Sequence, residues 1–148
     1  MALSSQIGAV RTALKSALQA RAALSGVSIT RFRPSPDDEN AVEAIWLEDA
    51  DGEQQPAANS LRWDDIILQV VVKVRKPGDG EAVAAAAEDR ALILFAEVEA
   101  AVTADHELGG VVLTCDIGRY STHQELEPSN RVCRLEADIT FQTEIANS

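Results

Sequence analysis

The sequence contains few aromatic residues, cysteines and histidines, and each shortage excludes certain kinds of core or site. Aromatic residues make up 4% of the 148 residues and hydrophobic residues 46%, so we expect an aliphatic core. Two cysteines are too few for a disulfide-built scaffold or a structural zinc site. We therefore expect a single domain over residues 1–148 in which Cys115 and Cys133 are free, packed thiols, with a disulfide between them as the alternative.

Long apolar runs and a secretion signal are also missing. No stretch is apolar over the length that a transmembrane helix needs. The first residues, MALSS, lack the basic start and the apolar block of a signal peptide. The sequence therefore predicts a protein that is made and folded in a cytoplasm and has no membrane contact.

Recognisable catalytic patterns are absent as well. The sequence has no glycine-rich phosphate loop, nucleophile elbow or His-Glu-x-x-His motif. Of the two histidines, His106 follows an acidic helix and His123 lies in an expected loop. Asp64 and Asp65 are neighbours on an expected strand, where adjacent side chains point to opposite faces. We predict no catalytic, cofactor-binding or metal-binding residue, and hence no enzyme.

Acidic residues are missing from the first quarter of the chain. Residues 1–36 contain five basic residues and no acid, whereas the whole chain has a net charge of −11. A chain this acidic is a poor candidate for tight nucleic-acid binding, which depends on cations placed on phosphates. The asymmetry suggests that the basic region docks on an acidic surface of its own or a neighbouring subunit; separately solvated faces are the alternative.

The strongest structural signal is a strand followed by a long helix. Residues 63–75, WDDIILQVVVKVR, alternate with one wholly apolar face, as in a strand of a half-covered sheet. Residues 77–80, PGDG, provide a turn. From residue 81 to 104 the period becomes helical, with the apolar stripe Val83, Ala87, Leu94, Val98 and Ala101.

The remaining elements are weaker. We expect a first helix capped by Ser4 or Ser5 and ending near residue 24, and strands over residues 27–33, 41–48, 111–120 and 131–145. Polar segments 49–60 and 121–130 read as loops. The order α-β-β-β-α-β-β predicts an α+β fold: a mostly antiparallel sheet of about five strands with two main helices on one face.

The polar segment 49–60 contains a partial likeness to a calcium loop. Residues 49–52, DADG, have the spacing of its first ligands, but Leu47 and Ala58 occupy positions where ligands are required. We expect a solvated turn near Asp51 and Gly52.

Two features suggest contacts beyond one subunit. The central and last strands are longer than the usual ~5–6 residues, so we expect them to extend past the domain body or join a larger sheet. Leu92 lies on the polar side of the second helix, where a monomer favours a polar residue. Both features favour an oligomer.

Taken together, these elements resemble the tail terminator (tail-completion) proteins of long-tailed bacteriophages and related phage-like particles. The likeness covers most of the chain. It includes the N-terminal helix leading through Ser25-Gly26-Val27 to a short strand, the central strand and helix, Leu108-Gly109-Gly110-Val111 opening the fourth strand, and the long last strand.

The resemblance implies a virion protein that forms a ring, expected to be a hexamer, which caps the tail tube and joins it to the neck or head-completion protein. DNA would pass through the lumen without specific binding, as an acidic lining allows. The resemblance carries no catalytic residue and no cofactor. Opposite charges suit head-to-tail contacts that close into rings. Our interface hypothesis comprises Arg11, Lys15 and Arg21 on one side and Glu88, Asp89, Leu92 and Glu97 on the other.

Other functions remain open. Another neck protein, such as a head-completion or stopper protein, would share size, ring assembly and location. A ligand-binding module with a pocket between sheet and helices is the alternative from a different class, and a small hydrolase comes third.

Overall fold

The computed structural model describes residues 6–35, 41–56 and 61–146. The element order confirms the expected α-β-β-β-α-β-β arrangement, with one additional short 3₁₀ helix, η1. The elements are α1 (Ile7–Gln19), η1 (Ala22–Leu24), β1 (Ser28–Thr30), β2 (Glu43–Pro56), β3 (Leu61–Pro77), α3 (Glu81–Ala104), β4 (Thr114–Glu127) and β5 (Asn130–Ala146).

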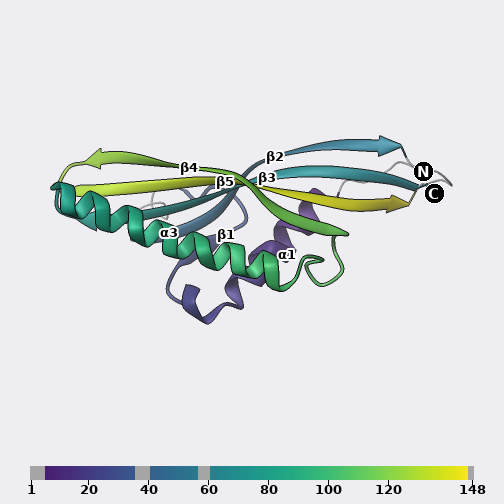
Figure 1. Cartoon of the computed structure of the whole chain (residues 1–148), viewed down its shortest axis with the longest axis horizontal. Coiled ribbons are helices and arrows are strands. Elements are labelled where there is room, and N and C mark those ends of the chain that lie inside the picture. The colour runs from purple at the N-terminus through teal and green to yellow at the C-terminus, as the bar shows by residue number, and fades with distance from the viewer. Residues whose placement is uncertain (1–5, 36–40, 57–60, 147–148) are drawn as a thin grey trace.

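The strands form one mixed sheet with both helices on the same face (Figure 1). Its spatial order is β1-β2-β3-β5-β4. β1 runs parallel to β2, and the other neighbours are antiparallel, which confirms a mostly antiparallel α+β fold. β3 and β5 pair along their whole length, from Leu61 opposite Ala146 to Pro77 opposite Asn130.

The hydrophobic core fills the space between the sheet and the helices. α3 begins and ends where the sequence predicts, and Ala87, Leu94, Val98 and Ala101 of its expected stripe are buried. Val83, also expected in the stripe, is only partly buried. The sheet contributes alternating side chains of β3 and β5, which are fully or almost fully buried: Ile66, Leu68, Val70, Val72, Val74, Cys133, Leu135, Ala137, Ile139 and Phe141. These two strands therefore form the centre of the sheet, as their apolar alternation predicts.

The expected loop over residues 49–60 is wrong for residues 49–56, because β2 continues to Pro56. Asp51 pairs with Ile67 and Gly52 with Ile66, so the expected turn at these residues is wrong too. A β-bulge between Leu47 and Ala50 shifts the register and lets the strand continue. β1 ends before it reaches the second half of β2. That half is therefore a free sheet edge, where the polar residues of β2 are tolerated. Residues 57–60 lie outside the described part of the chain.

The expected loop over residues 121–130 is also largely strand. β4 runs on to Glu127, and the tight turn before β5 uses Ser129 with a φ of 63°. β4 lies at the sheet edge and most of its side chains are exposed, so polar residues fill both faces and the alternation disappears. β4 also starts at Thr114, leaving Leu113 outside the strand and exposed instead of facing inward.

The N-terminal expectations need smaller corrections. The first helix ends at Gln19, and η1 occupies the end of the expected helix. Gly26 then has the expected positive φ, 86°. The strand expected over residues 27–33 is only Ser28–Thr30. The expected serine caps, Ser4 and Ser5, lie outside the described residues.

Both cysteines are free and buried, as expected. Cys115 pairs with Phe141 and Cys133 with Gln124, so the two thiols lie in different rows of the sheet. Burial, assisted by nearby carboxylates, raises the pKa of each thiol to about 11. Neither thiol is therefore reactive near neutral pH.

The long strands extend beyond the rest of the sheet. β4 begins level with Gln142 of β5, which pairs with Asp65 of β3. Past this row only β2, β3 and β5 continue, and their ends run on beyond the helices (Figure 1). We call this part, residues 54–56, 61–64 and 143–146, the three-strand tip. Among the described residues, no helix has the length and hydrophobicity of a membrane span.

We expect Leu94→Ala to lower the free energy of unfolding by about 2–5 kcal/mol, because a fully buried leucine leaves a cavity in the core. Leu92→Ala, a half-turn away and 39% exposed, is the matched control and should change it by about 0.5 kcal/mol or less in the monomer. Chemical denaturation of dilute protein measures both. Equal losses would contradict the packing of α3 described above.

Candidate subunit interface

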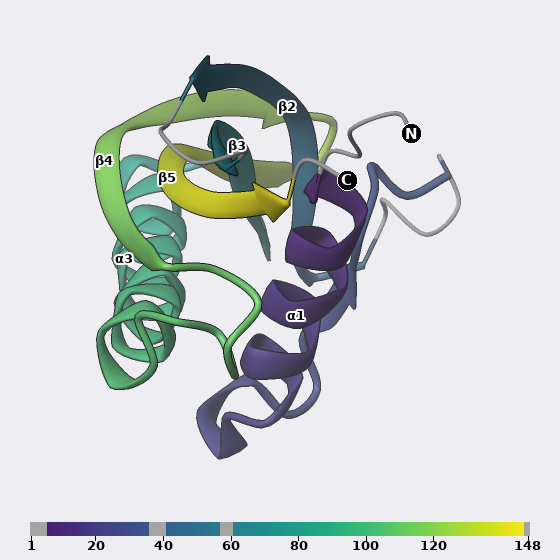
Figure 2. The ribbon, with the colours of Figure 1, turned by 90° about the vertical axis from the view of Figure 1, so that its right-hand side faces the viewer.

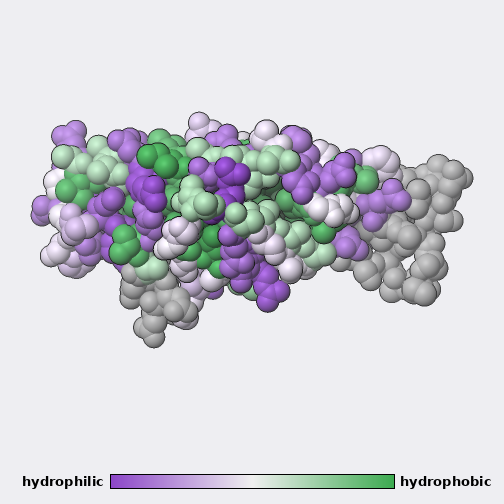
Figure 3. All heavy atoms as spheres, turned by 90° about the horizontal axis from the view of Figure 1, so that it is seen from below, coloured by the Kyte–Doolittle hydropathy of each residue, from purple (hydrophilic) through white to green (hydrophobic). Residues whose placement is uncertain are grey.

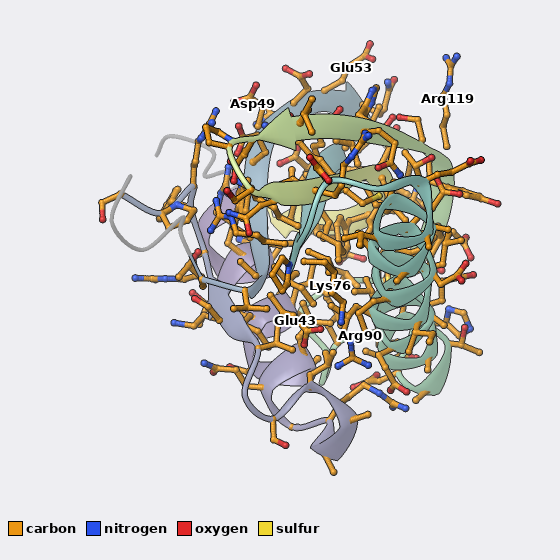
Figure 4. The ribbon with its side chains drawn as sticks, turned by 90° about the vertical axis from the view of Figure 1, so that its left-hand side faces the viewer. Glu43, Asp49, Glu53, Lys76, Arg90 and Arg119 are labelled. Carbon is orange, nitrogen blue, oxygen red and sulfur yellow. The ribbon has the colours of Figure 1, made fainter. Side chains whose placement is uncertain are left out.

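The two long sides of the molecule differ in the charged residues that their helices carry. α1 and the basic segment that follows β1 lie on one side, and α3 with β4 lies on the other (Figures 2 and 4). Lys15, Arg31 and Arg33 belong to the first side, and Glu88 and Asp89 to the second. The cations of the N-terminal region thus lie on the α1 side, where Asp49 of β2 also lies, and Arg119 lies on the side of α3 and β4 (Figure 4).

Arg11 joins α1 and the segment after β1 to strand β2. Its side chain is 8% exposed, and its guanidinium donates hydrogen bonds to the carbonyl oxygens of Arg31 (2.8 Å), Leu47 (3.2 Å) and Glu48 (2.7 Å). Leu47 and Glu48 lie at the bulge in β2, where carbonyls lose ladder partners. Burial lowers the pKa of Arg11, and Asp49 and Glu48 partly offset the effect.

Sequence reasoning placed Arg11 at the subunit interface and missed this structural role. The signal was its position: Arg11 follows Ile7 by four residues and precedes Leu14 by three, which puts it within the apolar stripe of α1. The guanidinium nitrogens of Arg11 bind carbonyl oxygens of the same chain. Arg11 therefore supports the basic surface from inside the subunit and does not form part of that surface.

The structure brings two of the predicted interface residues together within one chain. Arg21 Nε donates to Glu97 Oε2 at 2.6 Å, linking the end of α1 to α3. Both side chains thus already have a partner within the subunit.

The other predicted interface residues stay apart within the subunit. Lys15 is partly exposed on α1. Glu88 accepts hydrogen bonds from Thr122 Oγ1 and Gln124 Nε2, both at 3.3 Å, which tie α3 to β4. Asp89 and Leu92 face outward on α3.

Three exposed apolar side chains complete these surfaces and were missed from the sequence. Ile93 on α3 is 55% exposed, Tyr120 on β4 is 57% exposed, and Phe32 on the basic side is 59% exposed. The signal for Ile93 was the apolar run at residues 92–95, which surrounds the helix. Tyr120 had no signal, because its strand was expected to end there. Seen from the helix side, apolar residues lie exposed between hydrophilic ones (Figure 3).

An ion pair between β2 and α3 fixes the helix on the sheet. Arg90 Nε and a terminal nitrogen donate to Glu43 at 2.6 and 3.0 Å, and the two side chains point toward one another near Lys76 (Figure 4). The hydrogen bond from Arg90 lowers the pKa of Glu43, while burial opposes the shift; Arg90 and Lys76 add favourable charge. Arg75 and Glu127 form a second such pair at 2.8 Å, between β3 and β4.

The helix-free face of the sheet carries a polar network. Glu48 accepts a hydrogen bond from Trp46 Nε1 at 2.5 Å, and Arg134 Nε lies 3.0 Å from Glu136 Oε1. His123, expected in a loop, lies in β4, 3.7 Å from Glu136. The described residues contain no His, Cys, Asp and Glu cluster that could hold a metal ion.

The other residues that were considered for catalysis, a histidine and a pair of aspartates, lie apart from one another. His106 Nδ1 is 3.1 Å from the carbonyl oxygen of Cys115, just after α3. Asp64 is buried on the helix side, whereas Asp65 is partly exposed and faces away, so the two carboxylates do not share a site, as expected.

Two surface hollows of the described residues lie away from the sheet–helix layer, which is where the alternative of a ligand-binding module would place its pocket. One, of about 340 Å³, lies on the helix-free face and is lined by residues that include Asp65, Ile67, Asp116 and Thr140. The other, of about 430 Å³, lies between the ends of α1 and α3 and is lined mainly by alanines. The sheet–helix layer itself is filled by core side chains.

No model of a known protein family matches the chain, and no curated protein matches it. A chain from a solved structure described as the virion of a native gene transfer agent (GTA) particle is similar to it. The match covers 93% of this chain and 96% of that chain, with a TM-score of 0.49 and 17% sequence identity. A likeness of this degree does not assign a function.

We expect Arg11→Met to lower the free energy of unfolding by about 2–4 kcal/mol, because it keeps the volume but removes charged hydrogen bonds to carbonyls near the bulge. Lys15→Met, one turn further along α1, is the control and should change it by about 0.5 kcal/mol or less. Urea denaturation measures both. Equal effects would refute the anchoring role of Arg11.

We expect Glu43→Gln to destabilise the protein at neutral pH and to lose this effect in acid. The pKa of Glu43 is below its ordinary value of 4.5 in the folded chain, so its contribution is present above that pH and disappears as the pH falls through the lower folded pKa. Denaturation of both proteins from pH 7 downward tests this. Glu99→Gln, at an exposed position of α3, is the control. The prediction would be contradicted if the free energy of unfolding of Glu43→Gln differed from that of the wild type by the same amount at every pH.

Proposed function

We propose that this protein is a structural subunit of a phage-type virion, which assembles into a ring that caps the tail tube and joins it to the neck. The observation that carries the proposal is the opposite character of the two sides of one subunit. One side exposes Arg31 and Arg33 beside Phe32, and the other exposes Asp89 beside Leu92 and Ile93, with Tyr120 nearby.

Complementary surfaces on opposite sides of one molecule favour head-to-tail association. An interface of this type uses two different patches, so each added copy leaves both patches available for the next one. Such a chain of copies closes into a ring when the rotation between neighbours permits it. The sequence resemblance to tail terminator proteins suggests a hexamer.

The three-strand tip gives the proposed ring a second contact region. Its strands project past the helices at one end of the subunit (Figure 1). Ends of this kind suit contact with the next ring of a stacked assembly, and we propose the tail tube protein or the neck protein as the partner. The strongly acidic surface would let DNA pass through the lumen without specific binding.

In this proposal the protein is not an enzyme and requires no cofactor. It would be made in the host cytoplasm and incorporated into the virion. Head-completion and other neck proteins remain the alternative within the same assembly, because the same features suit any ring of the neck. A preference for isolated tail tubes over head connectors would separate the two.

We expect the purified protein to form rings with a central hole, alone or on isolated tail tubes, because its two sides are complementary. Light scattering after size exclusion gives the mass, and negative-stain images of the same peak give the shape. Serum albumin, also acidic, is the control for non-specific binding to tubes. A monomer that remains monomeric with tail tubes and with head connectors would refute the proposed function.

A further inference from the structure

We infer that the contact between neighbouring copies is formed by two particular patches, and this inference rests on the ring proposed above. The α3–β4 patch consists of Asp89, Leu92, Ile93, Ala96 and Tyr120. The α1–β1 patch consists of Thr12, Lys15, Arg31 and Phe32. Each α3–β4 patch receives the α1–β1 patch of the next copy.

The α3–β4 patch is one continuous surface. Asp89, Leu92, Ile93 and Ala96 lie three or four residues apart on the outer side of α3, so they are neighbours. Tyr120 is held beside them because its ring packs on Phe95 of α3, with ring centroids 5.3 Å apart. The patch therefore offers exposed apolar side chains with a carboxylate at its border.

The α1–β1 patch has the opposite charge and an aromatic centre. The guanidinium of Arg11 lies 4.6 Å from the centroid of the Phe32 ring, and that of Arg31 lies 5.9 Å from it. Arg31 also donates to Thr12 Oγ1 at 3.4 Å, which brings the patch onto α1, where Lys15 follows by three residues. An exposed aromatic ring with arginine side chains beside it is a typical anchor of protein interfaces.

The occupant of each patch is a second copy of this chain, because the chain itself supplies the complementary surface. Phe32 provides an apolar anchor for Leu92 and Ile93, and Arg31 and Lys15 provide cations for Asp89. The two patches lie on opposite sides of the molecule, so one copy cannot join them within itself (Figures 2 and 4). The contact is therefore head-to-tail.

Pairing of sheet edges is a less suitable way to join copies. Asp51 of β2 and Asp116 of β4 lie in the same row of the sheet, through Ile67 and Thr140. If β4 of one copy paired level with the free half of β2 in the next, these carboxylates would face each other, which is unfavourable. Side-chain contact between the patches avoids this repulsion.

Engineered thiols beside the anchors test the contact. Thr12→Cys and Ala96→Cys are at exposed positions and leave Phe32, Leu92 and Ile93 intact. The native thiols are buried with pKa values of about 11, so a short bis-maleimide at neutral pH reacts with the new ones. Mixing the two single variants should give cross-linked dimers, and the double variant should give a ladder of multimers.

The control and the contrary outcomes are as follows. Ala82→Cys, exposed in the first turn of α3 and outside the patch, should cross-link to Thr12→Cys on the order of tenfold less. Cross-linking no greater than this control would overturn the inference. So would dimers formed by either single variant alone in preference to the mixture, because these would indicate a symmetric contact.

Charge exchange provides an independent readout. Asp89→Arg in the Ala96→Cys chain should lower cross-linking several-fold, and Arg31→Glu in the partner chain should restore it. If the lost cross-linking is not restored, the proposed pairing of these charges is wrong.

Rings seen by electron microscopy without the cross-link would refute only the contact. Efficient cross-linking by a protein that binds neither tail tubes nor head connectors would refute only the virion function.

Discussion

The structure depends on a mismatch in length between its strands and its helices. β3 and β5 have 17 residues each, and such strands span about 56 Å, whereas the 24 residues of α3 span about 36 Å. One helix of this length cannot cover the whole sheet, and α1 covers only part of the remainder. The uncovered ends become the three-strand tip, and the short β1 leaves half of β2 as a free edge.

The subunit is completed by polar contacts placed where the hydrophobic layer is discontinuous. Arg11 binds carbonyls near the bulge that lets β2 continue into its polar half. Glu43 with Arg90 and Arg75 with Glu127 connect elements at the border of the core. These contacts hold α1 and α3 in fixed positions on the sheet, as the proposed head-to-tail contact requires.

The regular parts of the fold could be predicted because the spacing of their apolar residues indicates which side chains are buried. β3 and β5 alternate over their whole length, and α3 has the correct stripe and turn residues before it. The second halves of β2 and β4 could not be predicted in the same way. Both lie at free edges, where neither face has to be apolar, so the alternation that identifies a strand is missing.

The sequence by itself determined the fold class, the order of elements, the free thiols and the separation of charge, because each depends on local periodicity or composition. Only the tertiary structure decided which charged residues are used within the chain. Arg11 and Arg21 look alike as surface cations in the sequence, yet one binds carbonyls of β2 and of Arg31, just after β1, and the other binds Glu97. Such pairings depend on sheet register and helix orientation, which join residues far apart in the chain and have no local pattern.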